Sequence, residues 1–122
     1  GLIPMYIKTA YKKEPVFSQS KIIFTIGANT FKEKLGTGFV NNANIHINIK
    51  DKDLETLKDA TNTAMFRTGA AFADAITFGS DKTDKKLLEE FSKVKGKKII
   101  PFHGWDSDLT EYLELYNELA AK

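Results

Sequence analysis

Three short apolar runs constrain the fold of this chain more than any other feature of its sequence. They are KIIFTIG at residues 21–27, AITFG at residues 75–79 and KKIIPF at residues 97–102. The first is almost wholly apolar and β-branched before it ends at a glycine, which is typical of a strand buried on both faces of a sheet. The other two have a similar character, so we expect three short strands.

Segments with helical periodicity alternate with these runs, because apolar residues recur three or four positions apart between and around them. The residues that carry this periodicity are Leu2, Ile3, Tyr6, Ile7, Ala10, Tyr11, Ala64, Met65, Thr68, Phe72, Leu87, Leu88, Phe91, Leu109, Tyr112, Leu113, Tyr116, Leu119 and Ala120. Alternation of strand and helix predicts an α/β fold in three layers. We expect a mainly parallel sheet of about three core strands, closed by a C-terminal helix with Asp106 or Ser107 as its N-cap.

The connection between the first strand and the next helix is long for such a link. Its turn-forming residues are Gly36, Gly38, Asn41 and Asn42. Ile45, Ile47 and Ile49 alternate with polar residues, which favours a short additional edge strand. Residues 51–58 can form one or two helical turns, and long connections at strand ends often carry function.

Composition limits the classes of partner. The 122 residues suffice for a single domain, and the net charge of +2 arises from 18 basic and 16 acidic residues spread along the chain. With one arginine, Arg67, and no aromatic–basic platform, we expect no nucleic-acid partner. The apolar runs are far too short for a membrane span. The absence of cysteine excludes disulfides, thiol nucleophiles and cysteine metal sites, and is compatible with the cytoplasmic location that we expect.

Ligands of open parallel sheets bind just beyond the carboxyl ends of the strands, so the candidate site residues lie there. They are Gly27, Ala28, Asn29, Thr30, Lys32, Ser80, His103 and Trp105. The group after the first strand suits a polyhydroxylated or anionic ligand, although an ordinary loop explains it more simply. Ser80 or Asp81 can instead cap the following helix. His103 and Trp105 can form a sugar platform, or can serve only packing and capping.

No set of residues in the sequence has the pattern of an active centre. His46 and His103 are the two histidines, and they form no plausible metal or proton-transfer set. Neither a G-x-G-x-x-G phosphate loop nor a serine elbow occurs. We therefore predict no catalytic residue, no metal site and no cofactor in this chain.

Three segments in order, GLIPMYIK, IIFTIGANTFKEKLG and FRTGAAFADAITFGS, resemble successive parts of the N-terminal domain of bacterial glycogen synthases and plant starch synthases. That family has a helix beginning Gly-Leu-x-Pro-x-Tyr, a strand ending Phe-Thr-x-His-Asn and a unit Gly-x-x-x-Ala-Asp-x-Ile-Thr-x-x-Ser. The matching residues here are Gly1, Leu2, Pro4, Tyr6, Phe24, Thr25, Gly69, Ala73, Asp74, Ile76, Thr77 and Ser80.

The resemblance implies a retaining glycosyltransferase that transfers glucose from ADP-glucose to an α-1,4-glucan, with the reaction in a cleft between two Rossmann-like domains. The N-terminal domain serves the acceptor side, and the C-terminal domain binds most of the nucleotide sugar. A last helix in many members reads Trp followed by Tyr-x-x-Leu-Tyr. Trp105, Tyr112, Leu115 and Tyr116 have this form. Residues 104–122 are therefore similar to the helix that returns to the N-terminal domain, and Leu109, Tyr112, Leu113 and Tyr116 are expected to pack on its sheet.

The chain also departs from the family pattern. Gly27 and Ala28 stand where the family has His-Asn, and only 24 residues, 81–104, stand where it has a nucleotide-sugar domain. The family's donor loop would precede Gly1, so we expect the chain to begin inside a larger protein. We interpret residues 1–122 as one domain, the C-terminal portion of a glycogen-synthase-like N-terminal domain with a partial Rossmann-like fold, and predict that it is inactive alone.

Two other interpretations remain open. One is a non-catalytic glucan-binding or regulatory module derived from the same domain. The other is an unrelated flavodoxin-like or receiver-like domain, which predicts a strand-end acidic cluster or a flavin-shielding aromatic pair that the sequence does not show. The expected partners are an α-1,4-glucan and, if part of the sheet is missing, either a second copy of the chain or the missing N-terminal half.

Overall fold

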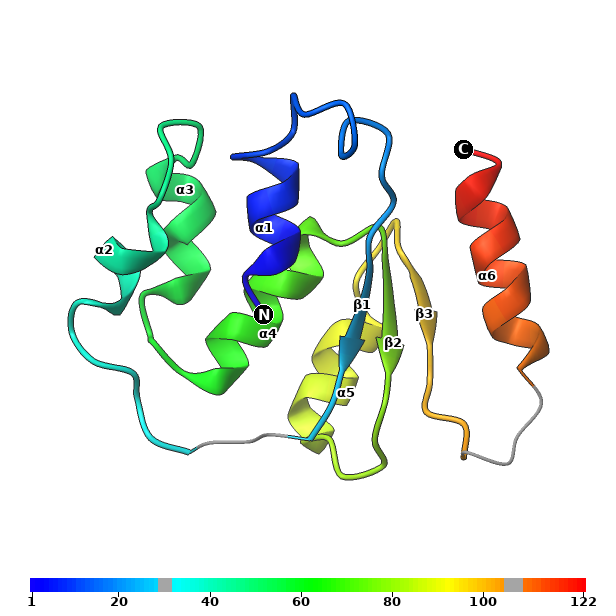
Figure 1. Ribbon diagram of the computed structural model, residues 1–122. Coiled ribbons are helices and arrows are strands. Elements are labelled where there is room, and N and C mark those ends of the chain that lie inside the picture. The colour runs from blue at the N-terminus through cyan, green and yellow to red at the C-terminus, as the bar shows by residue number, and fades with distance from the viewer. Residues whose placement is uncertain (29–31, 105–108) are drawn as a thin grey trace.

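The computed structural model of the chain describes residues 1–28, 32–104 and 109–122 (Figure 1). Its strands are β1 (Ile23–Ile26), β2 (Ala75–Phe78) and β3 (Lys98–Ile100). Its helices are α1 (Ile3–Lys8), α2 (Phe39–Ala43), α3 (Asp51–Leu54), α4 (Asn62–Phe72), α5 (Lys85–Ser92) and α6 (Thr110–Ala120), with a 3₁₀ turn η1 (Glu55–Leu57) after α3. The three predicted strands and the α/β class are confirmed.

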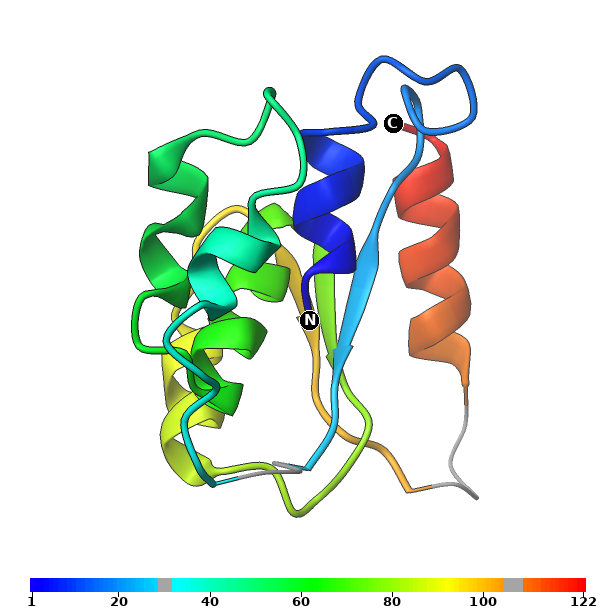
Figure 2. The same cartoon turned by 60° about the vertical axis from the view of Figure 1, so that its left-hand side comes forward.

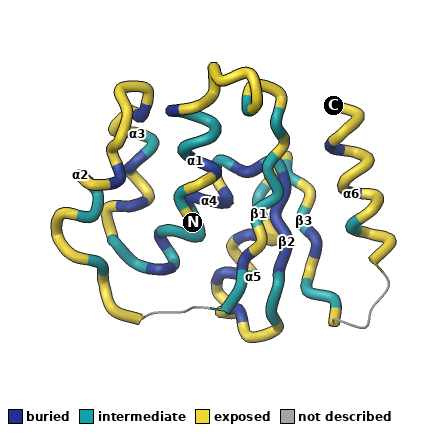
Figure 3. Tube along the Cα trace, in the orientation of Figure 1, coloured by how far each residue is buried: buried dark blue, intermediate teal, exposed yellow. Residues whose placement is uncertain are grey.

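The strands form one parallel sheet in the order β1-β2-β3. Ile23 of β1 lies opposite Ala75 of β2, and Ala75 lies opposite Lys98 of β3. All of β2 is buried, because it is the central strand, whereas only Ile26 of β1 is buried (Figure 3). The prediction that residues 21–27 are buried on both faces is therefore wrong: β1 is an edge strand, and Thr25 is exposed.

Helices cover both faces of the sheet, which gives the predicted three layers (Figure 2). Ile26, Ile76 and Phe78 point to α4 and α5, where they pack against Leu87 and Phe91. The alternate positions of the strands face α6, and Ala75 and Ile100 there contact Leu115 and Leu119. Because side chains alternate between the faces of a strand, each strand contributes to both cores.

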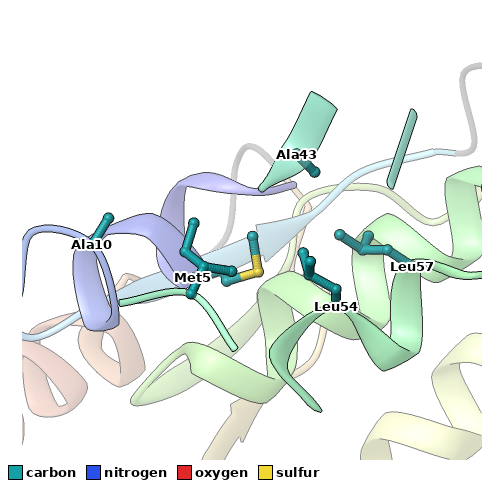
Figure 4. Packing of buried hydrophobic residues seen from close by; sticks show 6 residues of the cluster. Met5, Ala10, Ala43, Leu54 and Leu57 are labelled. Atoms are coloured by element: carbon teal, nitrogen blue, oxygen red, sulfur yellow. The ribbon is translucent and has the colours of Figure 1, made fainter. Parts of the chain in front are cut away.

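A further group of helices packs on the outer side of α4. Its core consists of Met5, Ala10, Ala43, Ile49, Leu54 and Leu57 (Figure 4). Tyr6 of α1 donates a hydrogen bond from its hydroxyl to the Ala43 carbonyl at 3.1 Å, which ties α1 to the end of α2. This small core explains why the long connection after β1 is ordered into α2, α3 and η1.

The additional edge strand predicted at residues 45–49 does not form. The Ile49 N–H donates to the His46 carbonyl at 2.9 Å, so the segment turns back on itself. Ile49 is buried in the outer helical core, whereas Ile45 and Ile47 are 53% and 84% exposed. The segment lies on the far side of α4 and α1 from the sheet, so its alternating isoleucines have no strand to pair with (Figure 1).

The predicted helix caps require two corrections. Asp84, rather than Ser80 or Asp81, caps α5, because its carboxylate accepts the Lys86 N–H at 2.9 Å. Helix α6 begins at Thr110 with Leu109 in the N-cap position. The predicted caps Asp106 and Ser107 lie outside the described residues.

The predicted packing face of α6 is also largely wrong. Leu115 and Leu119 are buried against the sheet and Tyr112 is partly buried there, but Leu109, Leu113 and Tyr116 are more than half exposed. The exposed residues form a second apolar stripe along the helix. Among the described helices, none is long and apolar enough to cross a membrane.

Candidate functional site at the carboxyl ends of the strands

A pocket of about 420 Å³ opens between α6 and the carboxyl ends of β1 and β2. The residues that line it are Thr25, Thr77, Phe78, Gly79, Phe102, His103, Gly104, Leu109, Tyr112, Leu113 and Tyr116. Its volume is in the range of small-ligand sites, and its position is the one at which parallel sheets bind their ligands. We call it the strand-end pocket.

Two threonine hydroxyls supply polar groups to the strand-end pocket. Thr25 and Thr77 lie directly opposite each other on β1 and β2, and their Oγ1 atoms are 2.8 Å apart. The strands approach closely here, since a Cβ atom on Gly79 would lie 2.9 Å from Cγ2 of Thr25. A hydroxyl can both donate and accept, so this pair can exchange its mutual hydrogen bond for bonds to a ligand.

His103 and Tyr112 contribute aromatic groups to the strand-end pocket, and Glu111 of α6 contacts His103 without lining the pocket. The Nε2 atom of His103 lies 2.7 Å from Oε2 of Glu111 on α6. The His103 ring meets the Tyr112 ring edge to face, with centroids 6.3 Å apart. These contacts hold His103, which lies three residues beyond the end of β3, against the first turns of α6. Imidazole and phenol groups beside apolar walls are groups that sugar hydroxyls and sugar C–H faces can contact.

Thr83 joins the loops that follow β1 and β2. Its side chain is buried, and its Oγ1 lies 3.3 Å from the Gly27 carbonyl oxygen and 3.2 Å from the Ser80 carbonyl oxygen. The Ser80 hydroxyl accepts the Lys82 N–H at 3.1 Å, so it supports its own turn. Two predicted site residues, Gly27 and Ser80, are therefore brought together through a residue that the sequence analysis did not single out.

The other predicted site residues have different positions. His103 lines the strand-end pocket, Ala28 is half-buried after β1, and Lys32 is exposed and does not line the pocket. Asn29, Thr30 and Trp105 lie outside the described residues. Gly27 has open space around its Cβ position, with no described atom within 4 Å, so the backbone would accommodate a side chain there.

Sequence reasoning missed the central threonines of the pocket as site residues. The sequence did contain a signal for these site residues. Thr25 and Thr77 are each a hydroxyl residue within an otherwise apolar strand. Their pairing could not be read from the sequence, since 52 residues separate them and the parallel register decides which residues meet.

Several residues that carry the family resemblance contact one another. The Phe24 ring packs on Gly69 of α4 so closely that a Cβ atom there would lie 2.5 Å from Cζ of Phe24. Gly1 lies against Met65 of the same helix, where a Cβ atom would be 3.0 Å from the Met65 Cβ. These glycines permit close approach of α4 to β1 and to the start of the chain. The resembling segments thus meet in space as well as in order.

Asp74 connects the amino ends of β1 and β2. Its Oδ2 accepts the Ile22 N–H at 2.7 Å and lies 2.8 Å from Nζ of Lys8. Partial burial alone would raise the pKa of Asp74, but the Lys8 ammonium and the Ile22 N–H outweigh it and hold this pKa below its ordinary value. Asp74 is therefore an ionised structural link, remote from the strand-end pocket.

The fold and the pocket define an α/β domain with a concave surface at the carboxyl ends of its strands. Among the described residues, no group of three or more histidine, aspartate or glutamate side chains is arranged to hold a metal ion. The family model described as the starch synthase catalytic domain matches residues 1–111, which include every strand and the beginning of α6. The chain belongs to this family of glycosyltransferase domains.

Neither the curated proteins nor the solved structures gave a significant match to the chain. The family assignment therefore depends on the family model, and it agrees with the residues that carry the resemblance.

Proposed function

We propose that this chain is part of a glycogen or starch synthase-like retaining glycosyltransferase, whose reaction transfers glucose from ADP-glucose to an α-1,4-glucan, and that the chain alone does not catalyse transfer. The observation that carries this proposal is the composition of the strand-end pocket. Its hydroxyl and aromatic groups suit a neutral glucan, and neither lysine nor arginine is among its described lining residues.

A diphosphate leaving group needs cationic or N–H donors held in place before the reaction, because negative charge develops on it in the transition state. The strand-end pocket supplies none from a lysine or arginine side chain in its described part. Gly27 also stands where the resembling enzymes have a histidine that contacts the transferred sugar. The pocket therefore fits an acceptor-side role better than a complete donor site.

The proposal is tested by incubating the purified chain with radiolabelled ADP-glucose and glycogen and counting label in the precipitated polymer. A complete synthase of the family serves as the positive control. We expect counts at the level of a no-protein blank. Label that increases with time and with protein concentration would show that the chain is active alone, contrary to the proposal.

A non-catalytic glucan-binding module is the second candidate, and the aromatic lining of the strand-end pocket favours it. Tyr116 lines the pocket and is 51% exposed, whereas Tyr11 is 42% exposed and does not line it. Stacking of a sugar on an aromatic ring contributes on the order of 1 kcal/mol. In glycogen co-sedimentation we expect Tyr116→Ala to weaken binding about fivefold and Tyr11→Ala to leave it unchanged. Equal effects of the two variants would reject binding at this pocket.

The free edge of β1 supports a further proposal about partners. Within the described residues β1 pairs only with β2, so one edge of the sheet has no strand beside it. We propose that a second copy, or a preceding segment of a longer chain, pairs with this edge. Size-exclusion chromatography with light scattering should show a concentration-dependent dimer of the isolated chain. A monomer over the whole concentration range would contradict pairing between copies.

A further inference from the structure

Lysines gather around a second hollow of about 370 Å³ that the proposed function does not use. The residues that line it are Lys8, Thr9, Lys12, Lys13, Asn48, Lys50, Lys52, Asp53 and Phe72. The chain as a whole is almost balanced in charge, with 18 basic and 16 acidic residues, so this accumulation is local. We call this hollow the lysine pocket.

The lysine pocket lies at the opposite end of the molecule from the strand-end pocket. Lys8, at the end of α1, contacts Asp74, which immediately precedes β2. In Figure 1 the strand arrowheads point toward the bottom of the view, whereas the end of α1 and the segment before α3 lie toward its top. The two pockets share no lining residue.

Most of the positive charge in the lysine pocket is not neutralised. In the part of the chain that the structure describes, Lys8 is paired with Asp74 at 2.8 Å, but no carboxylate lies within ion-pair distance of Lys12, Lys13, Lys50 or Lys52. The one acidic residue of the lining, Asp53, accepts the Lys50 N–H at 2.9 Å and so stabilises the start of α3. Repulsion among the lysines is a cost that a bound anion would relieve.

We propose that the lysine pocket binds a small ligand with more than one phosphate group. Several point-charge ammonium groups around one hollow can each contact a different phosphate oxygen. The volume admits a small molecule, and the hollow is concave, unlike the extended stripe that tracks a nucleic-acid backbone. Asn48 supplies an amide group to the lining, and Phe72 supplies an apolar surface.

The test is titration calorimetry of the full chain with inorganic pyrophosphate at low ionic strength. The pocket variant carries Lys12→Gln, Lys13→Gln and Lys52→Gln, all at exposed positions. The control variant carries Lys85→Gln, Lys86→Gln and Lys93→Gln on α5 and directly after it, which changes the net charge by the same amount. Circular dichroism confirms that each variant is folded.

We expect saturable pyrophosphate binding that the pocket variant weakens at least about tenfold and the control variant changes less than about twofold. Equal weakening by both variants, unchanged binding in the pocket variant or a failure to saturate would overturn the proposal. If a pentose bisphosphate binds more tightly than pyrophosphate, the ligand class is an organic phosphoester. If pyrophosphate binds more tightly, the ligand class is a free phosphate. A short single-stranded oligonucleotide that binds more tightly than both would contradict a small-ligand pocket.

Discussion

Asp74 and Gly69 belong to the same family-like segment, and both serve the packing of β1 and not the strand-end pocket. Asp74 holds the Ile22 backbone and the Lys8 side chain, while Gly69 lets the Phe24 ring contact α4. Residues that match the family pattern can therefore have a structural role. Gly69 permits close packing and Asp74 forms an ion pair, and neither needs a direct part in the chemistry.

The charge of Asp74 should stabilise the fold in a pH-dependent way. Because the pKa of Asp74 is lowered in the folded chain, its contribution is present above the ordinary aspartate pKa of about 4 and is lost as the pH falls through the folded value. We expect Asp74→Asn to lower the free energy of unfolding by about 1 kcal/mol at pH 7, and by much less near pH 2.5. Urea titrations at both pH values measure this.

The exposed Asp81 provides the control, and Asp81→Asn should change the free energy of unfolding by less than about 0.5 kcal/mol at either pH. A loss from Asp74→Asn that is the same at both pH values would show that the charge of this carboxylate is not responsible.

Gly69 should not tolerate a side chain. A Cβ atom would overlap the Phe24 ring at 2.5 Å, so Gly69→Ala should lower the free energy of unfolding by about 1–3 kcal/mol despite the better helix propensity of alanine. Gly27→Ala is the matched control and should be nearly neutral in thermal unfolding. Adding Phe24→Leu to Gly69→Ala should recover part of the loss. No recovery would count against the contact as the cause.

Helix α6 separates two properties of an element: its existence, which the sequence predicted, and its packing face, which the sequence did not predict correctly. Its apolar residues form two stripes, one with Tyr112, Leu115 and Leu119 and the other with Leu109, Leu113 and Tyr116. Both stripes satisfy helical spacing, so periodicity predicted the helix correctly but could not select the face that packs on the sheet. That choice is visible only in the packed structure, where Leu115 and Leu119 contact Ala75 and Ile100 of the sheet.

The packing of α6 leads to a paired prediction. Leu115→Ala removes a fully buried side chain and should cost about 2–4 kcal/mol, whereas Leu113→Ala removes one that is 60% exposed and should cost less than about 0.5 kcal/mol. Chemical denaturation of the two variants measures the difference. If Leu113→Ala were the more damaging change, the observed orientation of α6 would be wrong.

The order of strands and helices was predictable because each short apolar run can be buried only as a strand between helices. The failure at Ile45, Ile47 and Ile49 has a physical reason as well. Alternation of apolar and polar residues indicates only that a segment is able to pair as a strand. Here Ile49 is buried in the outer helical core, and none of the described strands lies beside the segment. Of the site residues predicted from the sequence, His103 is the one in the described lining of the strand-end pocket, whereas the Thr25–Thr77 pair and the Thr83 bridge depend on tertiary register.

At the scale of the whole molecule, the strand-end pocket and the lysine pocket differ in chemistry and lie toward opposite ends of the described fold. The strand-end pocket combines hydroxyl and aromatic groups, whereas the lysine pocket carries five ammonium groups, of which Lys8 alone is ion-paired with a described carboxylate. A neutral polysaccharide and a phosphorylated ligand would therefore bind without competing for the same residues. Stability measurements with each ligand alone and with both together can examine this separation, since each ligand that binds the folded state adds to the free energy of unfolding.

The central claim is that the strand-end pocket is the glucan-contacting surface of this synthase-like domain. The most direct measurement is a ¹H–¹⁵N NMR titration of the chain with a maltooligosaccharide. The account predicts shift changes at the amides of Thr25, Thr77, Gly79 and Tyr112, with no change at Lys12 or Lys52. A spectrum that stays unchanged at millimolar sugar, or shifts confined to residues outside the strand-end pocket, would contradict it.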